Sequence, residues 1–234
     1  MKPISSKGPI IQQSEDWNAP PISGETFSPF GPSIYIGNII PNVFHELNDK
    51  IESVQHEQDR DLRGRLAGRV EIQRDIHDLV SPQVHEHIRK HIINYTTQYG
   101  LGVEEYQIID DGMWVNCAKA NDFNPKHLHT GDFSYIIYTK NTIDYDDERN
   151  AKFDDNTSET NENIAGQLVL YYGEYQFLNC AQFSHRPQEG DIIIFPAFLQ
   201  HSVYPFYCDG ERWSVAGNYR FATYEELNPP QETD

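Results

Sequence analysis

The stretch NPKHLHTGDFSYIIYTK, residues 124–140, places two histidines at the entrance of an apolar strand. His127 and His129 are two residues apart, and the apolar segment Tyr135–Tyr138 follows soon after them. In an extended chain, residues i and i+2 point to the same side. Two imidazoles on one face of a strand entrance are able to bind one metal ion. The alternative is a polar loop in which both rings are solvated.

His201 is a third histidine in a similar position. It follows the segment GDIIIFPAFLQ, residues 190–200, which has the pattern of a turn, a buried strand and a short apolar loop. If the strands predicted at 135–139 and 202–205 line one small barrel, the histidines converge on one ion, as a transition-metal site requires. The alternative is a core histidine that is hydrogen-bonded to a backbone carbonyl.

The regions on either side of these histidines predict a mainly β fold with flanking helices. Apolar residues recur at helical spacing from Pro41 to Val54 and, after the Ser81-Pro82 start signal, from Val84 to Tyr99. Short β-rich runs follow from Gly100 onward. They are 106–109, 113–118, 135–139, 167–172, 175–178, 191–195, 202–205 and 213–221. About eight such strands predict a jelly roll, that is, a double-stranded β-helix.

The chain is long enough for one well-filled core, so we expect a single domain over residues 31–225. Residues 1–30 are rich in Pro, Ser, Gly and Gln and predict a flexible N-terminal arm. Residues 141–164 are dense in Asp, Glu, Asn and Thr, which predicts a polar insertion between strands. Residues 226–234 are expected to be a C-terminal tail.

Composition restricts the possible partners. The 18 Lys and Arg residues stand against 36 Asp and Glu, a net charge of −18, so a phosphate backbone would be repelled and nucleic-acid binding is not expected. The three cysteines, Cys117, Cys180 and Cys208, have no disulfide or zinc spacing, which fits a reducing cytoplasm. No apolar run approaches the length of a membrane span. Neither substrate nor oligomeric state has a readable pattern.

The last predicted strand carries a candidate anion clamp. Arg212 and Ser214 are two residues apart and share one face of this strand. The planar guanidinium binds carboxylates in bidentate geometry, and a partly buried arginine needs an anionic partner. A dicarboxylate ligand would be such a partner; the alternative is one of the many acidic residues of the chain.

Short blocks of sequence follow one another in a distinctive order. They are Phe30-Gly31-Pro32, Leu66-Ala67-Gly68, Trp114-Val115-Asn116, residues 124–134, Gly190-Asp191, Phe195-Pro196, His201 and Arg212-Trp213-Ser214. They cover most of residues 30–221. Taken in order, these blocks make the chain resemble the 2-oxoglutarate/Fe(II) oxygenases found in bacteriophages and marine bacteria, a prolyl-hydroxylase-like branch. In such enzymes the distal histidine precedes the co-substrate arginine by roughly ten residues, as His201 precedes Arg212 here.

One departure from the family leaves two possible ligand sets. The usual proximal motif is His-x-Asp or His-x-Glu, whereas His127 is followed two residues later by His129. In the first set, a bulge at Gly131 brings Asp132 to the metal beside His129 and His201. We prefer it because a carboxylate offsets the charge of the ion. In the second, favoured by strand alternation, His127, His129 and His201 bind the metal and Asp132 orients an imidazole.

The resemblance implies a dioxygenase, most simply a hydroxylase, that binds Fe(II) and uses 2-oxoglutarate as co-substrate. Arg212 and Ser214 would bind the far carboxylate of 2-oxoglutarate, and Asn116 and Tyr138 are further candidates to contact it. The locally basic segment 63–69 is a candidate lid or substrate loop. The alternative function is a cupin-like metal-binding protein, or a structural or carbohydrate-binding jelly roll, without 2-oxoglutarate chemistry.

Overall fold

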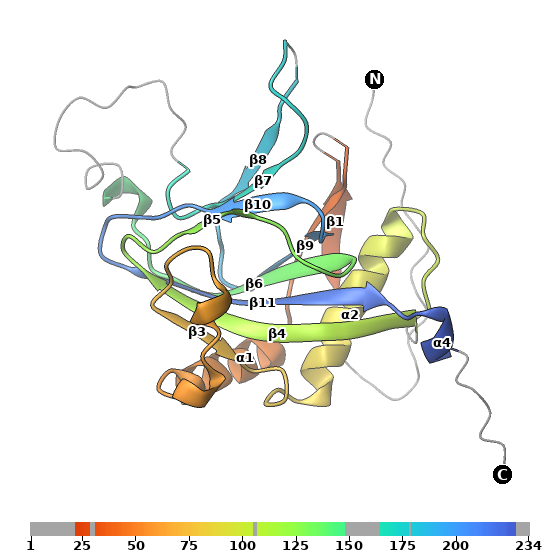
Figure 1. Ribbon diagram of the computed structural model, residues 1–234, viewed down its shortest axis with the longest axis horizontal. Helices are drawn as coiled ribbons and strands as arrows, with labels where there is room; N and C mark the ends of the chain where they lie inside the picture. The colour runs from red at the N-terminus through yellow and green to blue at the C-terminus, as the bar shows by residue number, and fades with distance from the viewer. Residues whose placement is uncertain (1–21, 29–30, 105–106, 148–163, 178, 228–234) are drawn as a thin grey trace.

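The computed structural model describes residues 22–28, 31–104, 107–147, 164–177 and 179–227. Two antiparallel sheets lie one above the other, and the two long helices lie beside the larger sheet (Figure 1). This is the predicted jelly roll with flanking helices, so the fold class is confirmed. No helix in the described part of the chain is long and apolar enough to cross a membrane.

Every strand in both sheets pairs antiparallel with its neighbours. The larger sheet has the order β1 (Ser23–Phe27), β2 (Ile34–Asn38), β9 (Asp191–Pro196), β6 (Phe133–Asn141), β11 (Glu211–Phe221), β4 (Ile108–Lys119) and β3 (Ile72–Asp75). The smaller sheet has the order β5 (Asn124–His127), β10 (Gln200–Val203), β7 (Leu168–Tyr171) and β8 (Gln182–His185).

The helices α1 (Pro41–Val54) and α2 (Pro82–Gln98) confirm the two helical predictions. Each begins with a proline in its first turn, where the missing N–H costs no hydrogen bond. Their apolar stripes are buried against the outer face of the larger sheet. Tyr99 is the exception: it follows the last helical residue and is 55% exposed. Short helical turns occur at Gln58–Arg60 (η1), Arg63–Arg65 (η2) and Tyr224–Leu227 (α4).

Strand β6 has two apolar faces because it is covered on both sides. Tyr135 and Ile137 pack with the helices, whereas Ile136 and Tyr138 pack in the core between the two sheets. A strand that is buried on both faces has a continuous apolar run in place of alternation. The same alternation in β9 sends Phe195 into the space between the sheets.

Several strands differ from the prediction. The run 113–118 and the last two residues of the run 106–109 belong to one long strand, β4. Tyr175 and Phe177 lie at the exposed tip of the β7–β8 hairpin, beyond the turn at Gly173, and the returning strand is Gln182–His185. The strands β1, β2, β3, β5 and β8 were not predicted, because they are short and carry few apolar residues in alternation.

The predicted domain limits are corrected at three places. Ser23–Phe27 is not part of a free arm, because it pairs in full register with β2 as an edge strand. The start of the predicted insertion is anchored, since Ile143 and Tyr145 pack with Phe206. Glu226 and Leu227, predicted as the start of the tail, belong to the short helix α4. Residues 1–21, 148–163 and 228–234 lie outside the described residues.

Candidate metal centre and co-substrate cavity

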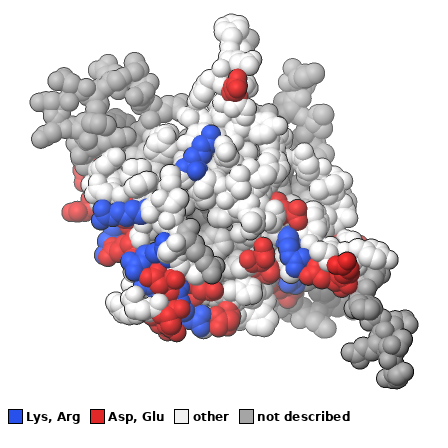
Figure 2. All heavy atoms as spheres, viewed as in Figure 1, with Lys and Arg blue, Asp and Glu red and all other residues white. Residues whose placement is uncertain are grey.

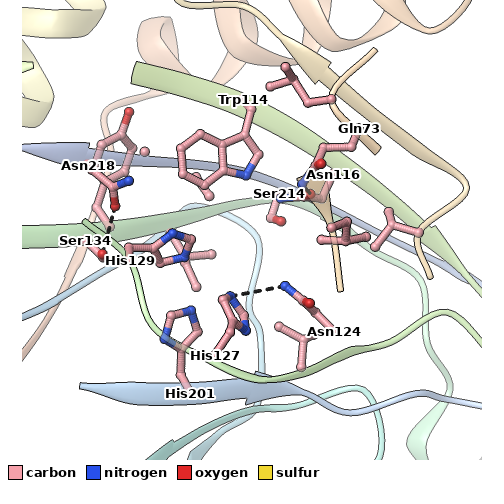
Figure 3. A pocket seen from close by; sticks show the side chains of 18 of the residues that line it. Gln73, Trp114, Asn116, Asn124, His127, His129, Ser134, His201, Ser214 and Asn218 are labelled. Atoms are coloured by element: carbon pink, nitrogen blue, oxygen red, sulfur yellow. Dashed lines mark hydrogen bonds between the residues drawn. The ribbon is translucent and has the colours of Figure 1, made fainter. Parts of the chain in front are cut away.

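The three histidines predicted as ligands come together between the two sheets. His127 ends β5, His201 lies on the neighbouring strand β10, and the two are direct partners in the antiparallel register. His129 follows in the loop that leads to β6. Its ring centroid lies 5.0 Å from that of His127 and 5.0 Å from that of His201, and those two are 4.2 Å apart. Figure 3 shows the three rings turned toward one another on the cavity wall.

Backbone carbonyls fix the orientation of two of these rings. Nδ1 of His127 donates to the carbonyl of Pro125 at 2.7 Å, and Nδ1 of His201 donates to that of Leu199 at 3.1 Å. A ring that donates through Nδ1 presents the lone pair of Nε2. The amide of Asn124 donates to Nε2 of His127 at 3.1 Å, so this lone pair faces a polar partner. Carbonyl-oriented imidazoles are a regular feature of metal sites.

Burial keeps the three imidazoles neutral. Desolvation lowers the pKa of His129 to about 4 and moves the pKa of His201 well below its usual value, and the neighbouring imidazoles add to both shifts. Desolvation also lowers the pKa of His127, against the opposing effect of its bond to Pro125. The neutral ring is the form that binds metal. At pH 7, three donor nitrogens are therefore available within 4.8 Å of one another.

Asp132 lies apart from this cluster. Its side chain is exposed, and Oδ2 accepts a hydrogen bond from the backbone N–H of Phe221 at 2.7 Å. Gly131 has the expected positive φ of 93°, but the backbone of Asp132 is bonded to Tyr219 and Ala197, which keeps its carboxylate at the outer end of β11. The preferred set with Asp132 as ligand is therefore not the one that the structure assembles. Asp132 orients none of the three imidazoles either.

Arg212 is buried in the same space. The residue belongs to β11, and only 5% of it is exposed. Its Nη1 donates to the carbonyls of Gly166 at 2.7 Å and Tyr204 at 3.4 Å. Burial lowers the pKa of its guanidinium. No ion pair joins Arg212 to a carboxylate of the described residues. A buried cation without an anionic partner is costly, so the site favours an anionic ligand.

One cavity of about 440 Å³ is lined by the three histidines and by Arg212. Asn116, Tyr138 and Ser214 line it as well, and Ser214 is paired in register with both of the others across β4 and β6. The predicted co-substrate residues therefore share one cavity with the three histidines. Asp132 lines a separate, open depression on the surface.

The cavity also contains polar residues that the sequence prediction missed. Gln73 donates to Asn116 at 2.9 Å, and Ser134 donates to Asn218 at 2.8 Å (Figure 3). Gln73 lies on β3, a strand with no predictive pattern. Asn124 was part of the quoted motif, and its position three residues before His127 could have identified it as a neighbour of that ring.

The segment 63–69 borders the cavity, but with apolar side chains. Leu66 and Ala67 line the cavity, whereas Arg63 pairs with Asp61 at 2.6 Å and Arg69 with Asp122 at 3.5 Å. Figure 2 shows basic and acidic side chains interleaved over this part of the surface. The segment is therefore no free basic patch.

Comparison with known proteins gives the site its chemical context. Residues 112–218 match a family model described as "Putative 2OG-Fe(II) oxygenase". No curated protein matches the chain. A prolyl-4-hydroxylase from Pseudomonas putida is similar in structure, with a TM-score of 0.51 and 14% identity over 79% of this chain and 89% of that chain. A Trichoplax adhaerens prolyl hydroxylase, solved with a hypoxia inducible factor peptide, has a TM-score of 0.53 and 13% identity over 82% and 84%.

Proposed function

We propose that the chain, whose residues 112–218 match the 2OG-Fe(II) oxygenase model, is such an oxygenase, in which His127, His129 and His201 hold the iron and Arg212 holds 2-oxoglutarate. The chain is thus a non-haem iron dioxygenase of the hydroxylase type. The observation that supports the residue assignment is the shared cavity. The imidazoles of His127 and His201 lie on the smaller sheet, with that of His129 in the loop after β5. Arg212, which has no carboxylate partner among the described residues, lies on the larger sheet.

The residues fit Fe(II) and a dicarboxylate together. Imidazole nitrogen is a good ligand for iron, and the donor atoms of the three rings are within 4.8 Å of one another. Because none of the three ligands is a carboxylate, the protein does not offset the charge of the ion. The negative charge of the bound co-substrate offsets it instead, which makes metal binding and 2-oxoglutarate binding mutually favourable.

Each side chain then has a defined task. Arg212 and Ser214 bind the far carboxylate of 2-oxoglutarate, and Asn116, held by Gln73, and Tyr138 flank the molecule. When bound, Fe(II) supplies oxygen activation, in which 2-oxoglutarate is oxidised to succinate and CO₂ and one oxygen atom enters a C–H bond of the substrate. The protein contributes placement of both reactants and exclusion of water.

The substrate enters past an apolar rim. Leu62, Leu66 and Val70 line the cavity on one side, and the half-exposed Leu128 lies beside the metal-binding histidines. The Trp114 ring lies 5.5 Å from the ring of His129. This rim favours a substrate that presents an apolar portion to the iron, where the reacting C–H bond would lie.

We also propose a reducing, cytoplasmic location and no nucleic-acid partner. None of the three cysteines forms a disulfide, and Cys117 and Cys208 are buried. The net charge of −18 opposes binding to a phosphate backbone.

The decisive test is anaerobic. Purified protein receives Fe(II) and then 2-oxoglutarate, and we expect the visible metal-to-ligand charge-transfer band of chelated co-substrate. The band should be absent in His201→Ala and present in the control His45→Ala, whose side chain is exposed on α1. Folded protein that binds iron but gives no band would contradict the assignment of the co-substrate residues and favour a cupin-like metal site.

A further inference from the structure

A second group of metal-binding side chains lies on the other side of the larger sheet. His77 is in the turn after β3, His85 is in the first turn of α2, and Asp110 is near the start of β4. None of the three lines the co-substrate cavity. Their donor atoms all lie within 4.8 Å of one another, as in the histidine cluster between the sheets.

The distances are close to those of a coordination shell. Nδ1 of His85 lies 2.8 Å from Oδ2 of Asp110, and Nε2 of His77 lies 3.3 Å from Oδ1 of the same carboxylate. Zinc binds nitrogen and oxygen at about 2.0–2.2 Å, so neighbouring ligands of a tetrahedral ion are roughly 3.3 Å apart. The rings of His77 and His85 are 5.1 Å apart and nearly perpendicular, at 73°. Of the two contacts with the carboxylate, only that between His85 and Asp110 is shorter than this spacing, by a few tenths of an ångström.

The hydrogen bonds of the cluster leave a place for a cation. Nε2 of His85 lies 3.1 Å from the carbonyl of His77, which is an acceptor only, so this nitrogen carries a proton. In the neutral ring, Nδ1 then presents a lone pair to the carboxylate of Asp110. Two lone pairs at that distance repel each other unless a proton or a metal ion lies between them. A metal-binding imidazole usually donates the N–H of its other nitrogen to a partner such as a backbone carbonyl, as His85 does to His77.

The environment of His77 favours a metal ion over a proton between His85 and Asp110. Its Nε2 is buried and has no hydrogen-bond partner among the described residues, although a carboxylate oxygen is 3.3 Å away. Protonation of His85 would satisfy the bond between His85 and Asp110 but would leave this nitrogen unsatisfied. An ion in the centre satisfies both rings and the carboxylate together.

We propose that His77, His85 and Asp110 form a second metal site, which takes Zn²⁺ or a similar divalent cation, with water in the fourth position. Two imidazoles and one carboxylate are suitable zinc ligands. The positive charge of Arg89 acts on His85 and opposes the cation, but Asp110 acts on His85 more strongly. Asp110 itself is also held by the backbone N–H of Gly112 at 3.1 Å.

The bound ion has a structural role. It ties the turn after β3 and the first turn of α2 to the long strand β4, in addition to the backbone hydrogen bond from Ile76 to Met113 and the bond from His85 to the carbonyl of His77. Asp111 lies beside Asp110 and lines the co-substrate cavity, and Gly112 follows with a φ of 118°. The site therefore fixes the start of the strand that forms one wall of the cavity. This inference does not depend on the iron assignment.

The test is the zinc stoichiometry of the full chain. Protein stripped with a chelator is dialysed against Zn²⁺ in the presence of a competing chromophoric chelator, and bound zinc is measured by elemental analysis. We expect two zinc ions per chain, because the histidine cluster between the sheets also binds zinc. The double variant His129→Ala/His201→Ala should retain one ion, and so should His77→Ala.

Combining His77→Ala with the double variant should remove zinc binding, and the unfolding temperature should no longer rise with zinc. Asp110→Asn in the same background is the second variant, since it preserves shape; His56→Ala, exposed and in neither cluster, is the control. One zinc ion per wild-type chain, lost with His129→Ala/His201→Ala, would overturn the proposal. The proposal would also be overturned if His77→Ala and Asp110→Asn, each in the His129→Ala/His201→Ala background, both bound as much zinc as that background alone.

Discussion

At the scale of single residues, the proposed binding of the co-substrate depends on Arg212. Loss of one partner of a buried charge pair costs about 3–5 kcal/mol, so Arg212→Gln should raise the Kd of 2-oxoglutarate by on the order of 10² to 10³-fold. Arg212→Lys keeps the charge but not the planar fork, so its Kd for 2-oxoglutarate should lie between those of the wild type and Arg212→Gln. Isothermal titration of metal-loaded protein measures the effect.

The matched control is Arg220→Gln on the same strand. Its guanidinium is paired with Glu226 at the surface, away from the cavity, and its loss should leave the affinity for 2-oxoglutarate within about twofold. If Arg212→Gln bound 2-oxoglutarate as tightly as the control, the far carboxylate would have to bind elsewhere in the cavity.

Asp132 and His129 separate the two ligand sets that the sequence allowed. Asp132→Asn keeps an acceptor for the N–H of Phe221 and should retain full iron stoichiometry. His129→Ala removes one of three ligands and should lower the affinity for Fe(II) by at least 10-fold. Iron binding by dialysed, folded protein decides between them; loss of iron in Asp132→Asn would restore the set with the carboxylate.

The candidate site could be predicted where motif and chemistry coincide. His127, His129, His201 and Arg212 were identified because their spacing and residue types suit ligands and an anion clamp. The place of Asp132 could not be predicted, since a glycine bulge allows two directions for the next side chain and only the hydrogen bond to Phe221 selects one. Gln73 was missed because its contact with Asn116 comes from a distant strand.

At the scale of elements, helix α2 is held to the sheet by a chain of buried neutral groups. Tyr35 donates to Nδ1 of His91 at 2.7 Å, Nε2 of His91 lies 3.3 Å from Nε2 of His87, and the latter accepts from the N–H of Ile40 at 3.4 Å. Desolvation lowers the pKa of His87 to about 4 and that of His91 to about 3. Neither ring is able to gain a proton without loss of a hydrogen bond.

These shifts predict acid sensitivity of the fold. As the pH falls, the unfolded chain takes up protons near the ordinary histidine pKa of about 6.5, before the folded chain does. The contribution of neutral His87 and His91 to the free energy of unfolding is therefore complete above that pH and is lost as the pH falls toward 4. The loss should be on the order of 2 kcal/mol per histidine by about pH 4.5. Urea denaturation at several pH values measures it.

The double variant His87→Gln/His91→Gln should be less stable at pH 7 but should lose less stability on acidification. Wild type and variant share every other titrating group, so the difference between their slopes belongs to these two rings. His45→Gln on the exposed face of α1 should keep the wild-type slope. Equal slopes in wild type and double variant would show that the two histidines do not determine the acid response.

The elements themselves were predictable to different degrees. The helices α1 and α2 have long apolar stripes and clear start signals, and both were predicted. Strand β3, with only four residues, has no pattern of its own and exists because Ile72–Asp75 pairs with the long strand β4. The tip of the β7–β8 hairpin was predicted as a strand because of its aromatic residues, but Tyr175 and Phe177 are exposed there.

At the scale of the whole molecule, the proposed metal ligands and the proposed co-substrate residues lie on different sheets. His127 and His201 belong to the smaller sheet, whereas Arg212 and Ser214 belong to the larger one. A molecule that touches both the ion and Arg212 therefore links the sheets. Binding energies that depend on one another in this way must be reciprocal.

We therefore expect metal and 2-oxoglutarate to stabilise the fold together by more than the sum of their separate effects. At a ligand concentration of about 100 times Kd the gain is about 2.7 kcal/mol, which corresponds to roughly 5–10 °C in Tm for a chain of this size. Mn²⁺ replaces Fe²⁺ so that no oxidation occurs during heating. With Mn²⁺ present, 2-oxoglutarate should raise Tm by this amount; without metal, it should raise Tm by only a small part of it. Arg212→Gln should keep the shift that Mn²⁺ alone produces and lose the additional one. If 2-oxoglutarate raised Tm equally with and without metal, the two ligands would bind independently, and the cavity would not join them across the sheets.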